Sequence, residues 1–211
     1  MESIRRYVTT GLGVGVVVSG VWSSPSWADG GWHGDGLVGG VHVEHRDVPG
    51  SSFDELRLST VSPLSLQSLC DAIYPKALPA RLDRRFKKVE LLKETGTDRW
   101  TYEQISVPVV SDRDYVVHAR LEQPASSGHC AVSFASEEDA QHPPVPGYVR
   151  IPVIRGRWDV FPIDGGKVSV QYRIFSEPGG GVPAFLSTGG QRDAAVDFMK
   201  IILARATMQG S

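Results

Sequence analysis

The feature that most constrains this chain is a series of short segments between residues 89 and 176 that are rich in β-branched and aromatic residues. Turn clusters such as TGTD, QPASSG and DGG separate these segments. Such a composition is typical of strands, and strands at short, regular intervals indicate a meandering antiparallel sheet. The expected strands are 89–94, 100–107, 114–122, 129–136, 148–163 and 167–176.

A predicted hairpin and a helix precede this series. Residues 41–48 and 53–61 both alternate apolar and polar side chains, and the PGSS turn lies between them. Ser62 is a suitable N-cap and Pro63 suits the first helical position, so a helix is expected from there until Pro75 ends it. A second short helix is predicted over 79–86.

The chain ends in a segment with helical periodicity. Pro183 fits a helix start, and apolar residues recur at helical spacing up to Ala206, with an interruption expected at Gly189 and Gly190. The sum is an α+β fold in which a curved antiparallel sheet packs against a long C-terminal α-helix. A sheet wrapped round one helix often leaves a cavity between them.

The first 28 residues have the layout of a signal peptide. Arg5 and Arg6 precede the apolar segment GLGVGVVVSGVW, and Ser26 and Ala28 supply small residues for cleavage after Ala28. The alternative is an uncleaved membrane anchor, which the glycines and the short apolar core disfavour. Residues 29–40 form a glycine-rich leader, so regular structure is expected to begin near Val41. We therefore expect an exported protein, periplasmic or secreted.

Composition limits the choices further. A chain of 211 residues with 41% hydrophobic content suits one domain with a substantial core. The formal net charge is −2, and no long basic block occurs, which disfavours nucleic acid as a partner. Cys70 and Cys130 permit one disulfide, and two buried thiols are the alternative. No spacing in the sequence suggests a metal site or a cofactor.

Several stretches, in the same order, resemble the START lipid-transfer domains of the helix-grip superfamily. They are HVEHRDVPGSSFDELRLSTV, SPLSLQSLCDAIYP, VPVVSDRDY and RGRWDVFPIDGGKVSVQYRIFSEPGGGVPAFL, and the resemblance covers residues 32–208. It implies a START-like domain over 41–208 with an internal hydrophobic cavity under the C-terminal helix. It also implies noncovalent binding, and in some cases transfer, of a lipid or other hydrophobic small molecule. Transient membrane contact is compatible with this, and a monomer is expected.

Candidate cavity residues are the aromatic and apolar side chains of the strands, a few polar groups that could orient a ligand, and two residues of the last helix. They are Trp100, Tyr102, Arg113, Tyr115, Val117, Tyr148, Arg150, Trp158, Phe161, Tyr172, Phe175, Phe198 and Ile202.

The charged motif Ser111-Asp112-Arg113-Asp114 is interpreted as architecture. We expect Asp112 and Asp114 to cap turn amides and Arg113 to make an ion pair. In sterol-binding relatives an arginine reaches the cavity a few residues later, and that place here is Ala119. A charged ligand anchor at that position, and sterol as the ligand, are therefore not expected.

No catalytic residue is predicted. His118 is the histidine to consider as a general base, and an exposed strand histidine is the simpler interpretation. Two other functions stay open. One is an aromatase/cyclase-like enzyme that uses the same cavity, and the other is a protein-interaction module with a filled core.

Overall fold

The computed structural model describes residues 31–79, 83–107, 110–139, 141–182 and 189–209. Residues 1–28 lie outside this part, so the signal peptide stays a prediction. Ten strands, two α-helices and two short 3₁₀ helices are found in the described residues. They are β1 (His33–Val38), β2 (Val41–Arg46), β3 (Glu55–Ser62), α1 (Leu66–Ile73), β4 (Phe86–Thr95), β5 (Asp98–Ile105), β6 (Asp112–Gln123), η1 (Ala125–Ser127), β7 (Cys130–Ser136), β8 (Tyr148–Arg150), β9 (Val153–Ile163), η2 (Asp164–Gly166), β10 (Lys167–Glu177) and α2 (Gln191–Gln209).

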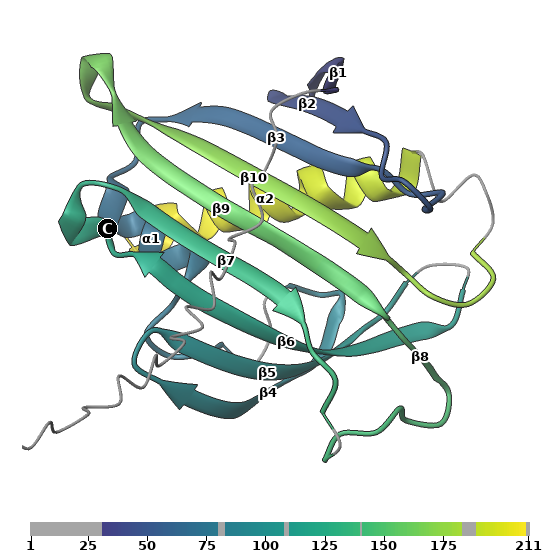
Figure 1. Cartoon of the computed structure of the whole chain (residues 1–211). Coiled ribbons are helices and arrows are strands. Elements are labelled where there is room, and N and C mark those ends of the chain that lie inside the picture. Colours follow the sequence, from purple (N-terminus) through teal and green to yellow (C-terminus); the bar gives the residue numbers. More distant parts are fainter. Residues whose placement is uncertain (1–30, 80–82, 108–109, 140, 183–188, 210–211) are drawn as a thin grey trace, which may run out of the picture. The chain divides into compact units, whose positions relative to one another are not determined.

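The strands form a single sheet with the order β1-β2-β3-β10-β9-β7-β6-β5-β4, and β8 pairs with β6 off this path. Neighbours along the path are antiparallel, whereas β8 lies parallel to β6. Helix α2 crosses one face of this sheet (Figure 1). The expected α+β helix-grip fold is therefore confirmed.

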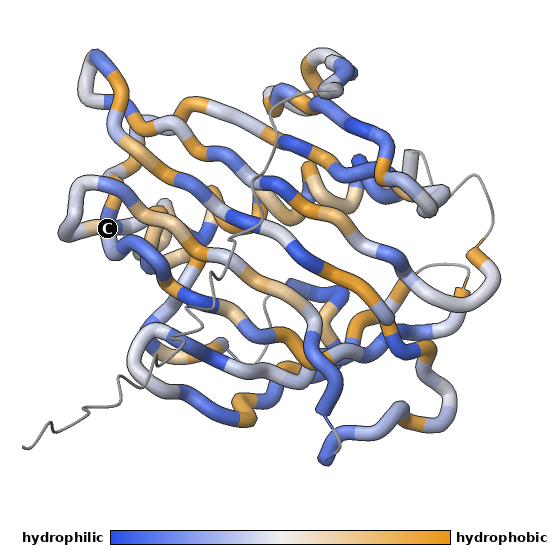
Figure 2. The backbone as a smooth tube through the Cα atoms, in the orientation of Figure 1, coloured by the Kyte–Doolittle hydropathy of each residue, from blue (hydrophilic) through white to orange (hydrophobic). Residues whose placement is uncertain are grey.

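The face of the sheet that packs against α2 is called the inner face here, and the opposite one the outer face. Val132, Trp158, Val160 and Tyr172 share one buried cluster with α2 residues such as Met199. The strand pairing then assigns each remaining strand residue to the inner or the outer face. Residues opposite each other on neighbouring strands share a face, and successive residues along a strand alternate between faces. The same alternation shows as blue and orange bands along the strands (Figure 2).

Helix α1 lies beside α2 and is joined to the sheet by a disulfide. Cys70 of α1 and Cys130 of β7 are bonded, with their Cα atoms 5.8 Å apart. The question that the sequence left open is thus answered in favour of a bridge. The bond fixes α1 to the inner face, where Leu69 and Ala72 are fully buried.

Three local predictions need correction. The glycine-rich leader does form structure, since β1 pairs with β2, and glycines with positive φ such as Gly36 allow the irregular register. Helix α1 begins at Leu66 because the Ser65 hydroxyl caps the amide of Ser68 at 3.0 Å, while Ser62 instead accepts from Leu64 before the helix. The described end of the predicted 79–86 helix is a turn that leads into β4 at Phe86.

The long C-terminal helix is confirmed over Gln191–Gln209, directly after Gly189 and Gly190. Its predicted start at Pro183 lies outside the described residues. No helix in the described ranges is long and apolar enough to cross a membrane.

Candidate ligand-binding site

The inner face of β5 carries a row of three buried polar residues. Arg99, Thr101 and Glu103 occupy alternate positions, and each pairs with an inner residue of β6, as in Thr101 opposite Val117. An inner strand face ordinarily carries apolar side chains, because burial of a polar group costs free energy unless it is hydrogen-bonded. This row is therefore the most unusual feature of the inner face.

Glu103 lies at the centre of a small hydrogen-bond cluster. The Thr101 hydroxyl donates to the Glu103 carboxyl group at 2.9 Å, and the hydroxyl of Tyr115, its cross-strand neighbour, also bonds to it. Burial raises the pKa of Glu103, and the two hydrogen bonds only partly oppose this effect. Burial likewise raises the pKa of Tyr115. The cluster thus favours a neutral acid and a neutral phenol, which can exchange hydrogen bonds with a polar group of a ligand.

Arg99 lies at the other end of the row, beside α1. Its Nε and Nη2 atoms donate to Oε1 of Glu94 at 2.9 and 2.5 Å, and its guanidinium stacks 4.3 Å from the ring centroid of Tyr74. Arg99 lines a hollow of about 420 Å³ between α1, η1 and the ends of β4, β5 and β6. Cys70 and Leu121 also line this hollow, so it opens on the inner side of the sheet.

An aromatic wall continues the inner face. Trp158 and Tyr172 stack with ring centroids 4.0 Å apart, and Phe198 of α2 lies 6.2 and 6.1 Å from them. Phe86 contacts Phe198 from β4, with ring centroids 6.4 Å apart. Rings in this arrangement offer a large apolar surface with few polar groups, as binding sites for apolar molecules require.

Part of the inner face is not covered by α2. Leu91 of β4 pairs with Thr101 and therefore shares the inner face, yet 48% of it is exposed. Phe198 and Ala119, also inner residues, are only partly buried. The side of the sheet formed by β4, β5 and β6 thus keeps apolar surface available beside the polar row. A continuous cavity under α2 stays a prediction.

The Asp112-Arg113-Asp114 motif makes structural contacts. Asp114 is fully buried and accepts from Nε and Nη2 of Arg150, both at 2.9 Å, and from the Tyr102 hydroxyl at 3.0 Å. Burial would raise the pKa of Asp114, but these hydrogen bonds outweigh it and lower the pKa. Asp112 pairs with Lys87. The motif therefore links β6 to β8, β5 and β4.

Arg113 differs from the expectation of an ion pair. Its guanidinium donates to the carbonyl oxygens of Pro178 and Gly179, at 3.3 and 3.2 Å, and to that of Ser111. The turn it holds needs glycine, because Gly179 has a φ of +66° and a Cβ there would lie 2.8 Å from the Arg150 carbonyl oxygen. Arg113 thus fixes the turn after β10, and the predicted ion pair belongs to Asp114 instead.

The structure divides the predicted cavity residues between the two faces, apart from Arg113, which holds the turn after β10. Six belong to the inner face or to α2 and lie within the buried clusters there: Tyr115, Val117, Trp158, Tyr172, Phe198 and Ile202. Six lie on the outer face, away from α2: Trp100, Tyr102, Tyr148, Arg150, Phe161 and Phe175.

The outer group cannot line a cavity between sheet and helix, because strand alternation points these side chains the other way. Trp100 pairs with His118, next to the inner pair Thr101 and Val117. Phe161 follows the inner residue Val160 and meets His129 edge to face. Phe175, three residues after Tyr172, is covered by the Arg155 guanidinium at 4.2 Å.

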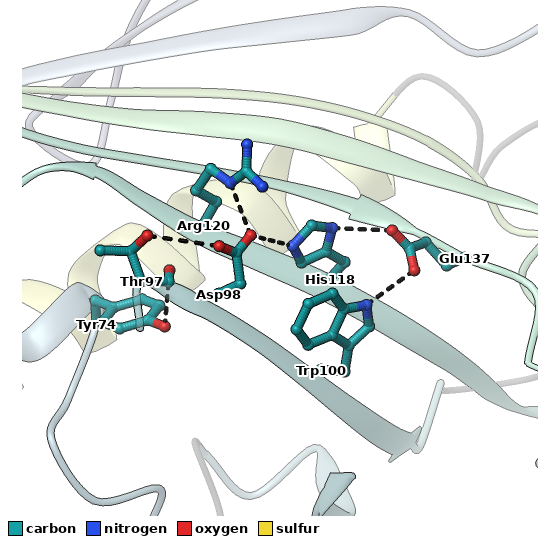
Figure 3. A network of polar contacts seen from close by, with 7 residues as sticks. All are labelled: Tyr74, Thr97, Asp98, Trp100, His118, Arg120 and Glu137. Atoms are coloured by element: carbon teal, nitrogen blue, oxygen red, sulfur yellow. Dashed lines mark hydrogen bonds and ion pairs between the residues drawn. The ribbon is translucent and has the colours of Figure 1, made fainter. Parts of the chain in front are cut away.

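His118 belongs to an outer-face network rather than to the site (Figure 3). Its ring stacks on Trp100 at 4.2 Å, and its two nitrogens contact Asp98 at 2.6 Å and Glu137 at 2.9 Å. The Trp100 indole also donates to Glu137 at 2.9 Å. The network ties β5 and β6 to the segment after β7. Within the described ranges no group of three His, Cys, Asp or Glu side chains is placed to hold a metal.

Sequence reasoning missed Arg99, Thr101 and Glu103. In the stretch RWTYE they alternate with Trp100 and Tyr102, and hydrophobicity alone directs the aromatic residues inward. Only the register found in the structure reveals their face, because Glu103 lies opposite Tyr115 and Thr101 lies opposite Val117.

Comparisons with known proteins agree with this fold. A STAR-related lipid transfer protein from Xanthomonas axonopodis is 27% identical, with a TM-score of 0.72, and the match covers 84% of this chain and 99% of that one. The human StAR-related lipid transfer protein 5 has a TM-score of 0.76 at 17% identity, over 87% of this chain and 89% of that chain. The resemblance to START domains is therefore confirmed at the level of structure.

Other matches are more distant or shorter. An aromatase/cyclase from a Streptomyces species has a TM-score of 0.51 at 15% identity, over 72% of this chain and 93% of that one, which shows a shared fold alone. An uncharacterized protein of Pseudomonas aeruginosa is 32% identical over 114 residues, 54% of this chain and 55% of that protein. The match thus spans about half of that relative. No protein-family model matches the chain.

Proposed function

We propose that this protein binds one amphipathic lipid, or a similar hydrophobic small molecule, noncovalently between α2 and the inner face of its sheet. The observation that supports this proposal is the buried row of Arg99, Thr101 and Glu103 beside the wall formed by Trp158 and Tyr172. A filled apolar core has no need of such a row, whereas a ligand with an apolar body and polar groups makes use of both surfaces. Transfer of this ligand between membranes is part of the proposal.

The solved relatives support this function at a general level. Two of the proteins with this fold are named as StAR-related lipid transfer proteins, and the bacterial one covers nearly the whole of this domain. Its identity of 27% is the higher of the two. Lipid or hydrophobic ligand binding is therefore the function class to test first.

Action outside the cytoplasm is the second part of the proposal. The pattern of residues 1–28 is that of a signal peptide, and the bond between Cys70 and Cys130 is independent support. Disulfides persist in oxidising compartments such as the periplasm and the extracellular space, and are rare in the cytosol. A lipid carrier in such a compartment would cross an aqueous gap that a free lipid cannot cross quickly.

A second candidate function is catalysis on a bound molecule. The observation that favours it is the buried contact between Glu103 and Tyr115, since a neutral carboxylic acid beside a phenol can donate and accept protons. An enzyme of this kind would convert an added ligand, whereas a carrier returns it chemically unchanged.

A pair of tryptophan substitutions tests the proposed site. Ala119 lies on the inner face opposite Phe134, while Ala135 lies on the outer face opposite His118. Ala119→Trp should fill the ligand space and abolish uptake of a fluorescent phospholipid from donor vesicles, with the circular dichroism spectrum unchanged. Ala135→Trp should take up lipid like the unmodified protein. Equal uptake by both variants contradicts the proposed site, and no uptake by the unmodified protein favours an interaction module.

A further inference from the structure

One stripe of helix α2 carries three residues that recur every seven positions. Gln191, Phe198 and Arg205 are each two helical turns apart, so they lie along the same side of α2 at intervals of about 10 Å. Phe198 fixes the direction of this stripe, because its ring contacts Trp158 and Tyr172 of the inner face. The stripe therefore faces the space in which the ligand is proposed to lie.

Both polar members of the stripe have a buried atom without a partner. Nη1 of Arg205 and Oε1 of Gln191 are buried and make no hydrogen bond in the described structure. The other Gln191 amide atom, Nε2, donates to the Ser176 carbonyl oxygen at 2.7 Å. Arg205 makes no hydrogen bond or ion pair with any described residue, which distinguishes it from the partnered arginines Arg99, Arg113, Arg150 and Arg157.

A half-buried guanidinium without a counter-charge among the described residues is costly. Removal of a charge from water without a counter-charge is among the largest single penalties in a protein interior. Burial lowers the pKa of Arg205, and no carboxylate opposes that effect. Replacement by a long apolar residue would remove this cost, and no described residue supplies a counter-ion to the guanidinium.

We propose that Arg205 binds the anionic group of the ligand, so that the carried molecule is an apolar chain bearing a carboxylate or a phosphate. Guanidinium groups bind both of these oxyanions through paired hydrogen bonds. This inference rests on the proposed function and deepens it. Glu103 and its hydrogen-bonded neighbours would then meet an uncharged polar group of the same molecule, because a buried acid there disfavours a second anion.

The test compares charged ligands with neutral analogues of the same chain. Oleic acid and phosphatidic acid supply a carboxylate and a phosphate, and oleyl alcohol and diacylglycerol are their neutral counterparts. Dissociation constants are measured by displacement of a fluorescent fatty acid from the full folded protein. Arg205→Met removes the charge and keeps the length of the side chain. Arg192→Met, a partly exposed arginine of the same helix beside Asp193, is the matched control.

The unmodified protein should bind at least one anionic ligand tenfold or more tightly than its neutral counterpart, and the identity of that ligand separates a carboxylate from a phosphate source. Arg205→Met should remove this preference while neutral ligands bind within about twofold, and its melting temperature should rise. Arg192→Met should keep the preference. Should Arg205→Met fail to fold, Arg205→Lys must retain the anionic preference.

Two results would overturn the proposal for Arg205 and leave lipid binding intact. One is equal affinity of the unmodified protein for charged and neutral ligands. The other is an anionic preference that survives in Arg205→Met. Failure of the unmodified protein to bind any of the four ligands would instead overturn the proposed function together with this inference.

Discussion

Asp114 and Arg150 form a two-point ion pair between β6 and β8, with Nε–Oδ1 and Nη2–Oδ2 distances of 2.9 Å each. The aspartate is fully buried, and the Tyr102 hydroxyl occupies one of its oxygens as well. Charged motifs in a binding protein invite a functional interpretation. These contacts indicate instead that the motif holds the short strand β8 and the end of β6 together.

Loss of the Asp114 carboxylate should destabilise the fold. Asp114→Ala leaves the Arg150 guanidinium without its partner, and breaking a buried pair in this way typically costs about 3–5 kcal/mol. Asp112→Ala breaks a pair with the half-exposed Lys87, which solvent screens, so its loss should lower the free energy of unfolding far less. Urea denaturation measures both free energies of unfolding. Similar values for the two variants would contradict the structural role of Asp114.

Glu103 should make stability decrease as pH rises. Because burial raises its pKa in the folded state, the folded protein holds the proton at pH values where the unfolded chain, with an ordinary pKa of about 4.3, has lost it. The contribution of Glu103 to stability is therefore greatest below that ordinary value and decreases as pH rises toward the raised pKa. In urea denaturation, the free energy of unfolding of Glu103→Gln should change less across this pH window than that of the unmodified protein. The control Glu138→Gln, at an exposed position, should show the same pH dependence as the unmodified protein. Identical pH profiles for all three proteins would argue against a buried acid at Glu103.

Tryptophan fluorescence should report ligand binding from the inner face only. Trp158 lies in the inner aromatic wall, whereas Trp100 stacks on His118 on the outer face. A bound lipid should therefore change the emission of Trp100→Phe about as strongly as that of the unmodified protein. The change should be largely lost in Trp158→Phe. If Trp100→Phe loses the signal instead, the assignment of the two faces is wrong.

Loss of the disulfide should weaken the attachment of α1. Replacement of Cys70 and Cys130 by alanine removes a cross-link over a sequence separation of 60 residues, and such a loss typically costs about 2–5 kcal/mol. Thermal denaturation should show a lower melting temperature for the double variant than for the unmodified protein. Dithiothreitol should lower the melting temperature of the unmodified protein and leave that of the double variant unchanged. An unmodified protein insensitive to the reductant would argue against the bond.

The sequence predicted the fold better than the site, for a physical reason. Alternation, turn residues and the periodicity of residues 191–209 mark elements locally, and the order of the START-like stretches fixes their arrangement. The face to which each strand residue points depends on register with distant partners. In β5 the aromatic residues Trp100 and Tyr102 are covered on the outer side by His118 and by the segment around His142, so hydrophobicity suggested the wrong face.

The same limit applies to charges. Nothing local distinguishes Arg113, which holds a turn through carbonyl oxygens, from Arg150, which pairs with Asp114. Arg205 could be recognised as unusual only once the stripe shared with Phe198 was placed against the inner face.

Native mass spectrometry of the protein purified from its own compartment, followed by extraction and identification of any bound molecule, tests lipid binding most directly. We expect one amphipathic lipid per protein chain, released unchanged on denaturation and absent from Ala119→Trp. A protein that carries no such molecule, and that also takes up none from lipid vesicles, would contradict lipid binding by this domain.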